Sequence, residues 1–430
     1  MKPQLTSNQP TRSQAVVVGM DLNDPLFEER LAEAVELVTS AGAAVAQTVV
    51  GKRAKPDAST FAGCGKVEEI AAAVAAHDAN LVVFNHQLSP IQIRNIEKTV
   101  GVRVIDRTDL ILDIFGQRAR SAEGKLQVEL AQMQHLMTRL VRGWTHLERQ
   151  RGGIGVRGGP GETQLEIDRR LVGDRIKRLK EKLKKLDRQR STQRSGRKRA
   201  GVFNVSIVGY TNAGKSTLFN RLTRSGAYVA DKLFATLDTT TRKLYIDPGI
   251  HVTVSDTVGF IRDLPHGLVA AFHATLTEAM EADLLLHVVD AASEMREQQI
   301  EDVNAVLAEI GAQHIPQVLV YNKIDRFEGV PLPSVLRDED GKIAELRVSA
   351  LAGFGMDLLR QTVKEHALAT GAEGIDVAGK RPHGDQVVAS GAQIGPEYFD
   401  HATAGLAAGS ENVVQNSTDM ETRSEFDAVI

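Results

Sequence analysis

Cysteine and long apolar runs are scarce in this sequence, and each shortage excludes a class of protein. The 430 residues include one cysteine, Cys64, so no disulfide framework can form within the chain, as is usual in a reducing cytosol. His and Cys residues do not stand at the spacing of a zinc site. No apolar run reaches the about 18 residues that cross a bilayer, and residues 1–12 lack the apolar centre of a signal peptide. We therefore expect a cytoplasmic protein without a transmembrane segment, and we take a monomer as the expected state.

Net charge is also small, but it is unevenly distributed. The whole chain carries −3, which by itself predicts no class of partner. From Arg139 to Arg199, 20 Lys and Arg stand against 7 Asp and Glu, a balance of +13 that leaves −16 for the remainder. A charge run is usually a solvated helical face, yet the size and arginine content of this one favour nucleic-acid contact. Trp144 is its only aromatic residue, which favours phosphate and shape recognition over base stacking.

The segment 209–216 has the form G-x-x-x-x-G-K-S of a phosphate-binding P-loop. The apolar residues 205–208 before it predict a buried strand, and residues 217–222 after it predict a helix. Glycines allow backbone N–H groups to close around phosphate oxygens, and the helix N-terminus favours negative charge. Lys215 can reach the β- and γ-phosphates, and the hydroxyl of Ser216 can bind Mg²⁺.

Two further motifs indicate that the nucleotide is GTP. The N-K-x-D motif at 322–325 follows an apolar strand, and the Asp325 carboxylate can accept hydrogen bonds from N1–H and the 2-amino group of guanine. Adenine lacks that donor pair, so its binding would leave the carboxylate unpaired. The D-x-x-G motif at 256–259 follows the strand 252–255. Asp256 would hold Mg²⁺ through water, and the N–H of Gly259 would sense the γ-phosphate.

Two loops complete the predicted site. Residues 234–238 lie between the P-loop and D-x-x-G, where a switch loop supplies a threonine hydroxyl, here Thr236, to Mg²⁺. Ser349 and Ala350 follow the strand 345–348, as expected for the last guanine-contacting loop.

The predicted roles fall into three groups. We assign catalysis to Lys215, Thr236 and Gly259. We assign Mg²⁺ binding to Ser216, Thr236 and Asp256. The nucleotide-binding residues are Gly209, Tyr210, Thr211, Asn212, Ala213, Gly214, Lys215, Ser216, Thr217, Phe234, Ala235, Thr236, Leu237, Asp238, Asp256, Thr257, Val258, Gly259, Asn322, Lys323, Asp325, Val348, Ser349 and Ala350.

The residue after D-x-x-G departs from the Ras-type pattern. Ras-type GTPases carry a glutamine there that orients the attacking water, whereas this chain has Phe260. A phenyl ring cannot orient water by hydrogen bonding, so we expect slow intrinsic hydrolysis and a partner that completes the site. A polar residue of the chain itself, such as His266 or Thr239, is the alternative.

The pattern of the sequence divides the chain into six segments. We expect a flexible N-terminus over residues 1–14. Strand and helix patterns alternate over 15–108, which predicts a small parallel α/β domain. The GTPase domain, also α/β, spans 202–370. Residues 371–430 are rich in Gly, Ala, Ser and Asn without periodicity, which predicts a disordered tail.

Residues 109–195 predict a long antiparallel helical hairpin. Apolar residues recur every three or four positions over 126–147 and again over 165–186, so two single seams can pack against each other. The break at 151–161 contains six glycines and predicts a tip loop that can approach an RNA backbone closely. Arg151 and Arg157 in this loop are the expected RNA contacts. Residues 196–201 are expected to form a linker.

With these motifs in place, residues 15–370 resemble the HflX family of translational GTPases. The most specific stretch is 152–170, GGIGVRGGPGETQLEIDRR, and FATLD at 234–238 and DTVGF at 256–260 are similar to the family as well. VIDRT at 104–108 and GKVEE at 65–69 support the resemblance. It implies a GTPase that binds the large ribosomal subunit and its rRNA, splits or rescues stalled ribosomes under stress, and directs its tip loop at the peptidyl-transferase region. Many members carry a small ordered C-terminal domain, which residues 371–430 do not resemble.

Three functions remain open on sequence alone. The chain could be a GTP-driven ribosome-binding factor, or an accessory GTPase for remodelling or modification of free RNA. It could also be a signalling switch in which the hairpin is a dimerisation arm. Sedimentation with ribosomal subunits, in the presence of a GTP analogue or of GDP, separates the three.

Overall fold

The structure is a computed structural model that describes residues 13–142, 164–199, 201–224, 233–248, 250–262, 273–329, 332–339, 341 and 343–370. Several expectations lie outside these residues: the N-terminal arm up to residue 12, the glycine-rich tip loop with Arg151 and Arg157, His266, and the tail from 371. No described helix is long and apolar enough to cross a membrane.

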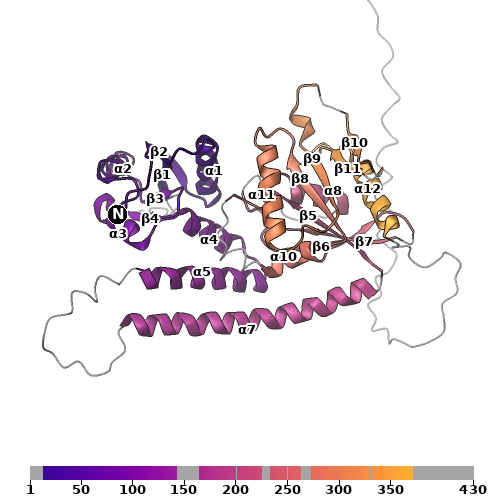
Figure 1. Cartoon of the computed structure of the whole chain (residues 1–430), viewed down its shortest axis with the longest axis horizontal. Coiled ribbons are helices and arrows are strands. Elements are labelled where there is room, and N and C mark those ends of the chain that lie inside the picture. Colours follow the sequence, from indigo (N-terminus) through magenta and orange to yellow (C-terminus); the bar gives the residue numbers. More distant parts are fainter. Residues whose placement is uncertain are drawn as a thin grey trace, which may run out of the picture. The chain divides into compact units, whose positions relative to one another are not determined.

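The N-terminal segment is a four-stranded parallel sheet with helices on both faces, which confirms the predicted α/β domain (Figure 1). The strand order is β2-β1-β3-β4. Side chains of β1 alternate between two cores: Ala15 and Val17 pack with α1 and α4, whereas Val16 and Val18 pack with α2 and α3. Because both faces are covered, β1 is apolar at nearly every position. The elements are β1 (Gln14–Asp21), α1 (Phe27–Ser40), β2 (Ala44–Lys52), α2 (Cys64–Ala76), β3 (Leu81–Phe84), α3 (Pro90–Val100), β4 (Arg103–Ile105) and α4 (Arg107–Arg118).

The helices α5 (Ala122–Arg142) and α7 (Gln164–Arg199) pack side by side (Figure 1). Ion pairs join Arg175 to Glu129 and the later Arg190 to the earlier Glu123, so the two helices run antiparallel. Two helix ends differ from the expected segments. α4 begins at 107 and packs on the N-terminal sheet, and α7 continues to 199, into the expected linker.

The remaining described residues form a seven-stranded sheet of the order β10-β11-β9-β8-β5-β7-β6. Strands β11, β9, β8, β5 and β7 are parallel, and the edge strands β10 and β6 are antiparallel to their neighbours. One face is covered by α8 and α12 and the other by α10 and α11, as in the predicted P-loop GTPase domain. The elements are β5 (Phe203–Gly209), α8 (Lys215–Thr223), β6 (Thr240–Tyr245), β7 (His251–Asp256), α10 (His273–Met280), β8 (Leu284–Asp290), α11 (Arg296–Glu309), β9 (Gln317–Asn322), the 3₁₀ helix η1 (Ile324–Arg326), β10 (Ser334–Arg337), β11 (Ile343–Arg347) and α12 (Met356–Ala369).

One apolar cluster joins the N-terminal domain to the switch segments of the GTPase domain. Phe115 of α4 meets Phe234 edge to face, with ring centroids 4.6 Å apart. Leu233, Leu237 and Phe260 are buried in the same cluster. Burial of this apolar surface holds the backbone of two GTPase loops in place, the loop that contains Leu233 and Leu237 and the loop that contains Phe260.

Candidate active site

The predicted motifs meet at the carboxyl edge of the GTPase sheet. β5, β7, β9 and β11 point the same way, so the loops that follow them lie at one edge, where ligands bind in open α/β sheets. A cavity of about 300 Å³ opens there. Its lining residues are Thr211, Asn212, Gly214, Lys215, Ser216, Thr217, Phe234, Ala235, Thr236, Thr257, Gly259, Asn322, Lys323, Asp325, Arg326 and Leu351.

Lys215 is the buried cation of the cavity. Its side chain is only 6% exposed, and its Nζ donates a 2.6 Å hydrogen bond to the carbonyl of Tyr210. Burial lowers the pKa of Lys215 to about 8, since the site removes water from the ammonium group without a carboxylate at hydrogen-bond distance. An anion in the cavity would restore the favourable environment of the charge. The P-loop is therefore suited to phosphate.

The three predicted metal ligands lie together. The hydroxyl of Ser216 is 2.7 Å from Oδ2 of Asp256 and 2.6 Å from Oγ1 of Thr236. Oδ1 of Asp256 is buried and has no hydrogen-bond partner among the described residues. Burial also raises the pKa of Asp256, although the Ser216 hydroxyl and the Lys215 ammonium act in the opposite direction. Hard oxygen ligands in this number fit Mg²⁺, which keeps several waters in its shell.

Asn322 ties the base-recognition loops to the P-loop. Its Nδ2 donates to the carbonyl of Ala213 at 2.9 Å, and its Oδ1 accepts from the N–H of Ala350, also at 2.9 Å. The hydroxyl of Ser349 donates to Asp325. These contacts leave the Asp325 carboxylate on the cavity wall, where a guanine edge can meet it.

Some residues that line the cavity were not predicted, and some predicted residues do not line it. Arg326 and Leu351 line the cavity and directly follow the N-K-x-D motif and the Ser349-Ala350 pair, so adjacency was the only signal for them. Leu237 and Val258 are buried in the apolar cluster. The other predicted residues that do not line the cavity are Gly209, Tyr210, Ala213, Asp238, Asp256, Val348, Ser349 and Ala350.

Asp238 of the switch loop contacts the hairpin instead of the cavity. Its Oδ2 accepts hydrogen bonds of 2.8 Å from the N–H groups of Arg120 and Ser121, and its Oδ1 accepts one from the Ser121 hydroxyl at 2.5 Å. The hydroxyl of Ser121 in turn accepts a 2.8 Å hydrogen bond from the N–H of Gly124 and so caps α5. Asp238 therefore holds the capping residue of α5 and places negative charge beside the helix N-terminus, where it is favourable. Through this cap the switch loop holds the first helix of the hairpin.

Gly124→Ala is expected to destabilise the protein, although alanine normally favours a helix over glycine by about 1 kcal/mol. A methyl group at Gly124 would overlap Oδ1 of Asp238 and displace the cap. We expect a loss of about 1–3 kcal/mol in urea unfolding, as for other overpacked sites. Gly173→Ala in α7 is the matched control, because its nearest neighbour would be Met137 Cε at 3.6 Å. Equal stability of the two variants would contradict the cap.

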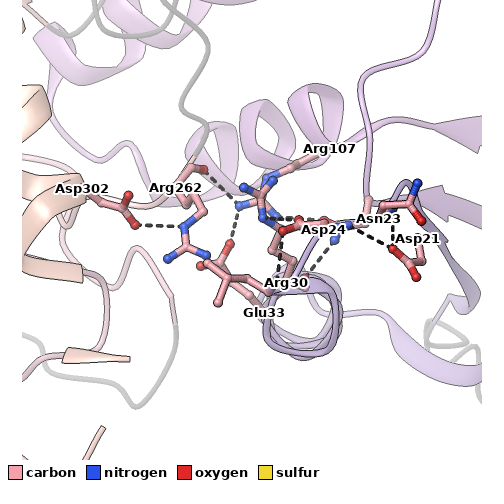
Figure 2. Close-up of polar contacts among 10 residues, drawn as sticks. Asp21, Asn23, Asp24, Arg30, Glu33, Arg107, Arg262 and Asp302 are labelled. Carbon is pink, nitrogen blue, oxygen red and sulfur yellow. Dashed lines mark hydrogen bonds and ion pairs between the residues drawn. The ribbon is translucent and has the colours of Figure 1, made fainter. Parts of the chain in front are cut away.

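A polar network from the N-terminal domain holds the P-loop and the segment after D-x-x-G. Glu33 of α1 accepts hydrogen bonds from Arg107 and from the Tyr210 hydroxyl. Arg107 also donates to the carbonyl of Arg262 at 3.1 Å, and the Arg262 guanidinium binds Asp302 at 2.9 Å (Figure 2). The N–H of Arg262 donates to the Tyr210 hydroxyl at 3.0 Å. Burial raises the pKa of Tyr210, so its hydroxyl keeps its proton to donate to Glu33.

Comparison with known proteins agrees with this geometry. Three family models match consecutive segments: GTP-binding GTPase N-terminal at 28–116, GTP-binding GTPase Middle Region at 118–197, and 50S ribosome-binding GTPase at 204–323. The chain is 54% identical over 352 residues to GTPase HflX of Escherichia coli (strain K12), covering 82% of each protein. It is 51% identical over 329 residues to GTPase HflX of Magnetococcus marinus, covering 76% of each.

Solved structures are less similar. A GTP-binding protein from the hyperthermophilic archaeon Sulfolobus solfataricus in complex with GDP aligns with a TM-score of 0.44 and 24% identity, over 83% of this chain and 99% of the other. That likeness is too low to support an inference. The curated relatives cover more than two thirds of the chain at far higher identity, and the GTPase motifs meet in one cavity. The chain therefore belongs to the HflX family, and it is a GTPase.

Proposed function

We propose that this GTPase binds the large ribosomal subunit in the cytoplasm through its helical hairpin, and that it acts in ribosome splitting, rescue or biogenesis under stress. The observation that carries the proposal is the charge of α7. Its 36 residues include 15 Lys and Arg and 5 Asp and Glu, a balance of +10. Among the residues of α7 whose burial is described, ten cations are exposed: Arg169, Arg170, Arg175, Lys177, Arg178, Lys180, Lys182, Lys184, Lys185 and Arg188.

Such a row of cations suits the phosphate backbone of structured RNA. Each phosphate that a Lys or Arg neutralises releases counterions, which makes binding strong and salt-dependent but little dependent on sequence. The relation to the family model described as a 50S ribosome-binding GTPase supports rRNA of the large subunit as the partner.

GTP would control the hairpin through the switch loop. Thr236 and Asp238 are two residues apart: the first lies beside the Ser216–Asp256 pair, and the second holds the residue that caps α5. In the proposed GTP state, Ser216, Thr236 and Asp256 would hold Mg²⁺, which would neutralise charge on the β- and γ-phosphates. A change in Thr236 on hydrolysis would then reach the α5 cap through a single intervening residue.

Replacement of both Arg151 and Arg157 by alanine is expected to weaken ribosome binding and to flatten its salt dependence. Each lost phosphate contact removes about one unit from the slope of log affinity against log salt. The measurement is sedimentation with purified ribosomal subunits at several salt concentrations, with a GTP analogue or GDP. GTP binding by the isolated protein should not change.

A matched control removes two exposed cations from α3, as Arg94→Ala with Lys98→Ala. This control should leave the slope of log affinity against log salt unaltered. Binding to free RNA that is indifferent to ribosomal subunits would contradict the proposal and favour an RNA-remodelling role. An unchanged slope in the Arg151 and Arg157 double variant would remove the tip loop from the interface.

A further inference from the structure

The family assignment leaves open which group orients the water that attacks GTP. Phe260 stands where Ras-type enzymes have glutamine, and its side chain is 2% exposed within the apolar cluster. It is not among the residues that line the nucleotide cavity. A hydrogen-bonding group in the cavity must therefore come from another residue or from a partner.

Thr211 lies where the P-loop meets the D-x-x-G loop. Its N–H donates to the carbonyl of Phe260 at 2.7 Å, and the N–H of Phe260 donates to the carbonyl of Gly209 at 3.1 Å. A Cβ atom placed on Gly259 would lie 2.9 Å from both Cα and Cγ2 of Thr211 and 3.0 Å from Nζ of Lys215. Thr211 thus borders the two groups that face the γ-phosphate in this class of enzyme.

The hydroxyl of Thr211 is buried. The residue is 6% exposed and lines the nucleotide cavity. Oγ1 has no hydrogen-bond partner among the residues that the structure describes. An unsatisfied buried hydroxyl costs about 1–3 kcal/mol, a cost that a bound water or substrate can remove.

The position of Thr211 is also firmly held. The preceding residue, Tyr210, is anchored through its hydroxyl to Glu33 and to the N–H of Arg262. The network of Figure 2 joins these two anchors to Arg107 and Asp302. A hydroxyl held in this way can orient a water without reorganisation during the reaction.

We infer that Thr211 positions the attacking water, its Oγ1 accepting a hydrogen bond that turns a lone pair of the water toward the γ-phosphorus. The bond from the water oxygen to the γ-phosphorus forms as the bond from that phosphorus to the β,γ-bridging oxygen breaks. GDP leaves with the electron pair, and the proton of the water passes to an oxygen of the released phosphate. Thr211 keeps its own proton and is a positioning residue, not a base.

Thr211→Val keeps the shape of the side chain and removes the hydroxyl, whereas Thr211→Ser keeps the hydroxyl. Single-turnover hydrolysis of GTP by the full-length protein should fall about 10- to 100-fold in the valine variant and less than about threefold in the serine variant. Affinity for GTP and GDP should stay within about threefold. Affinity for GDP with aluminium fluoride, which mimics the transition state, should fall in the valine variant alone.

Thr362→Val is the matched control, since Thr362 is fully buried in α12 and its hydroxyl bonds only the carbonyl of Leu358 among the described contacts. It should hydrolyse GTP at the unaltered rate. Three results would overturn the inference: an unchanged rate in Thr211→Val, equal losses in the serine and valine variants, or a parallel loss of GDP affinity. The last two would show a role in shaping the P-loop.

Discussion

Replacing Lys215 by methionine is expected to lower the affinity for GTP about 100-fold or more. Each charge-assisted hydrogen bond contributes about 1.5–3 kcal/mol, and this lysine can serve both the β- and γ-phosphates. Methionine retains an unbranched side chain of similar length, so the buried space remains filled. Titration with a fluorescent GTP analogue at fixed Mg²⁺ concentration measures the loss.

In the absence of nucleotide, the free energy of unfolding of the same variant should be no lower than that of the unaltered protein. Burial lowers the pKa of Lys215 to about 8, so at pH 7 the folded protein bears the cost of a charged group out of water. Methionine does not carry that cost. Lys243→Met, at an exposed position of β6, is the control for removal of a lysine charge. Undiminished GTP affinity in Lys215→Met would mean that the lysine does not contact the phosphates.

Asp325→Asn is expected to exchange base specificity. A carboxylate accepts both guanine hydrogen bonds, whereas an amide presents one acceptor and one mismatched donor. The affinity for GTP should fall about 10- to 100-fold, the effect of about 1.5–3 kcal/mol for a charge-assisted pair. Xanthine has a carbonyl in place of the 2-amino group, so xanthosine triphosphate should bind the variant better than GTP does.

Competition between the two nucleotides, measured on one preparation, gives the change in specificity directly. Glu328→Gln is the matched control, because it neutralises an exposed carboxylate three residues further along the chain. Its preference for GTP should be unaltered. If Asp325→Asn kept its preference for GTP, another residue of the cavity would be reading the base.

The linear sequence was enough to predict that the GTPase motifs meet at one cavity, because each motif carries its chemistry within a few residues. G-x-x-x-x-G-K-S needs only a strand before it and a helix after it, and β5 and α8 stand there. The N-K-x-D and D-x-x-G motifs follow β9 and β7, and parallel strands bring their carboxyl ends to one edge. Motif spacing therefore predicted a common cavity without any knowledge of side-chain packing.

Contacts between distant segments could not be read in this way. Asp238 belongs to a switch motif, yet its carboxylate binds Ser121, the residue that caps α5, more than a hundred residues earlier. Tyr210 is a variable position of the P-loop, and only the tertiary structure places Glu33 against its hydroxyl. A capping or bridging contact of this kind leaves no periodic pattern, because its two partners meet only after two domains pack together.

The sequence by itself therefore determined the GTPase chemistry, the α/β class and the basic character of the hairpin, since these depend on local spacing and composition. Tertiary structure decided which residues of the N-terminal domain, the helical hairpin and the GTPase domain contact one another. It buried Phe260 in the apolar cluster, left the Thr211 hydroxyl without a partner among the described residues, and joined the switch loop to the hairpin. The physical reason is that burial and hydrogen-bond satisfaction are properties of packed surfaces, and packing brings together residues that the chain keeps far apart.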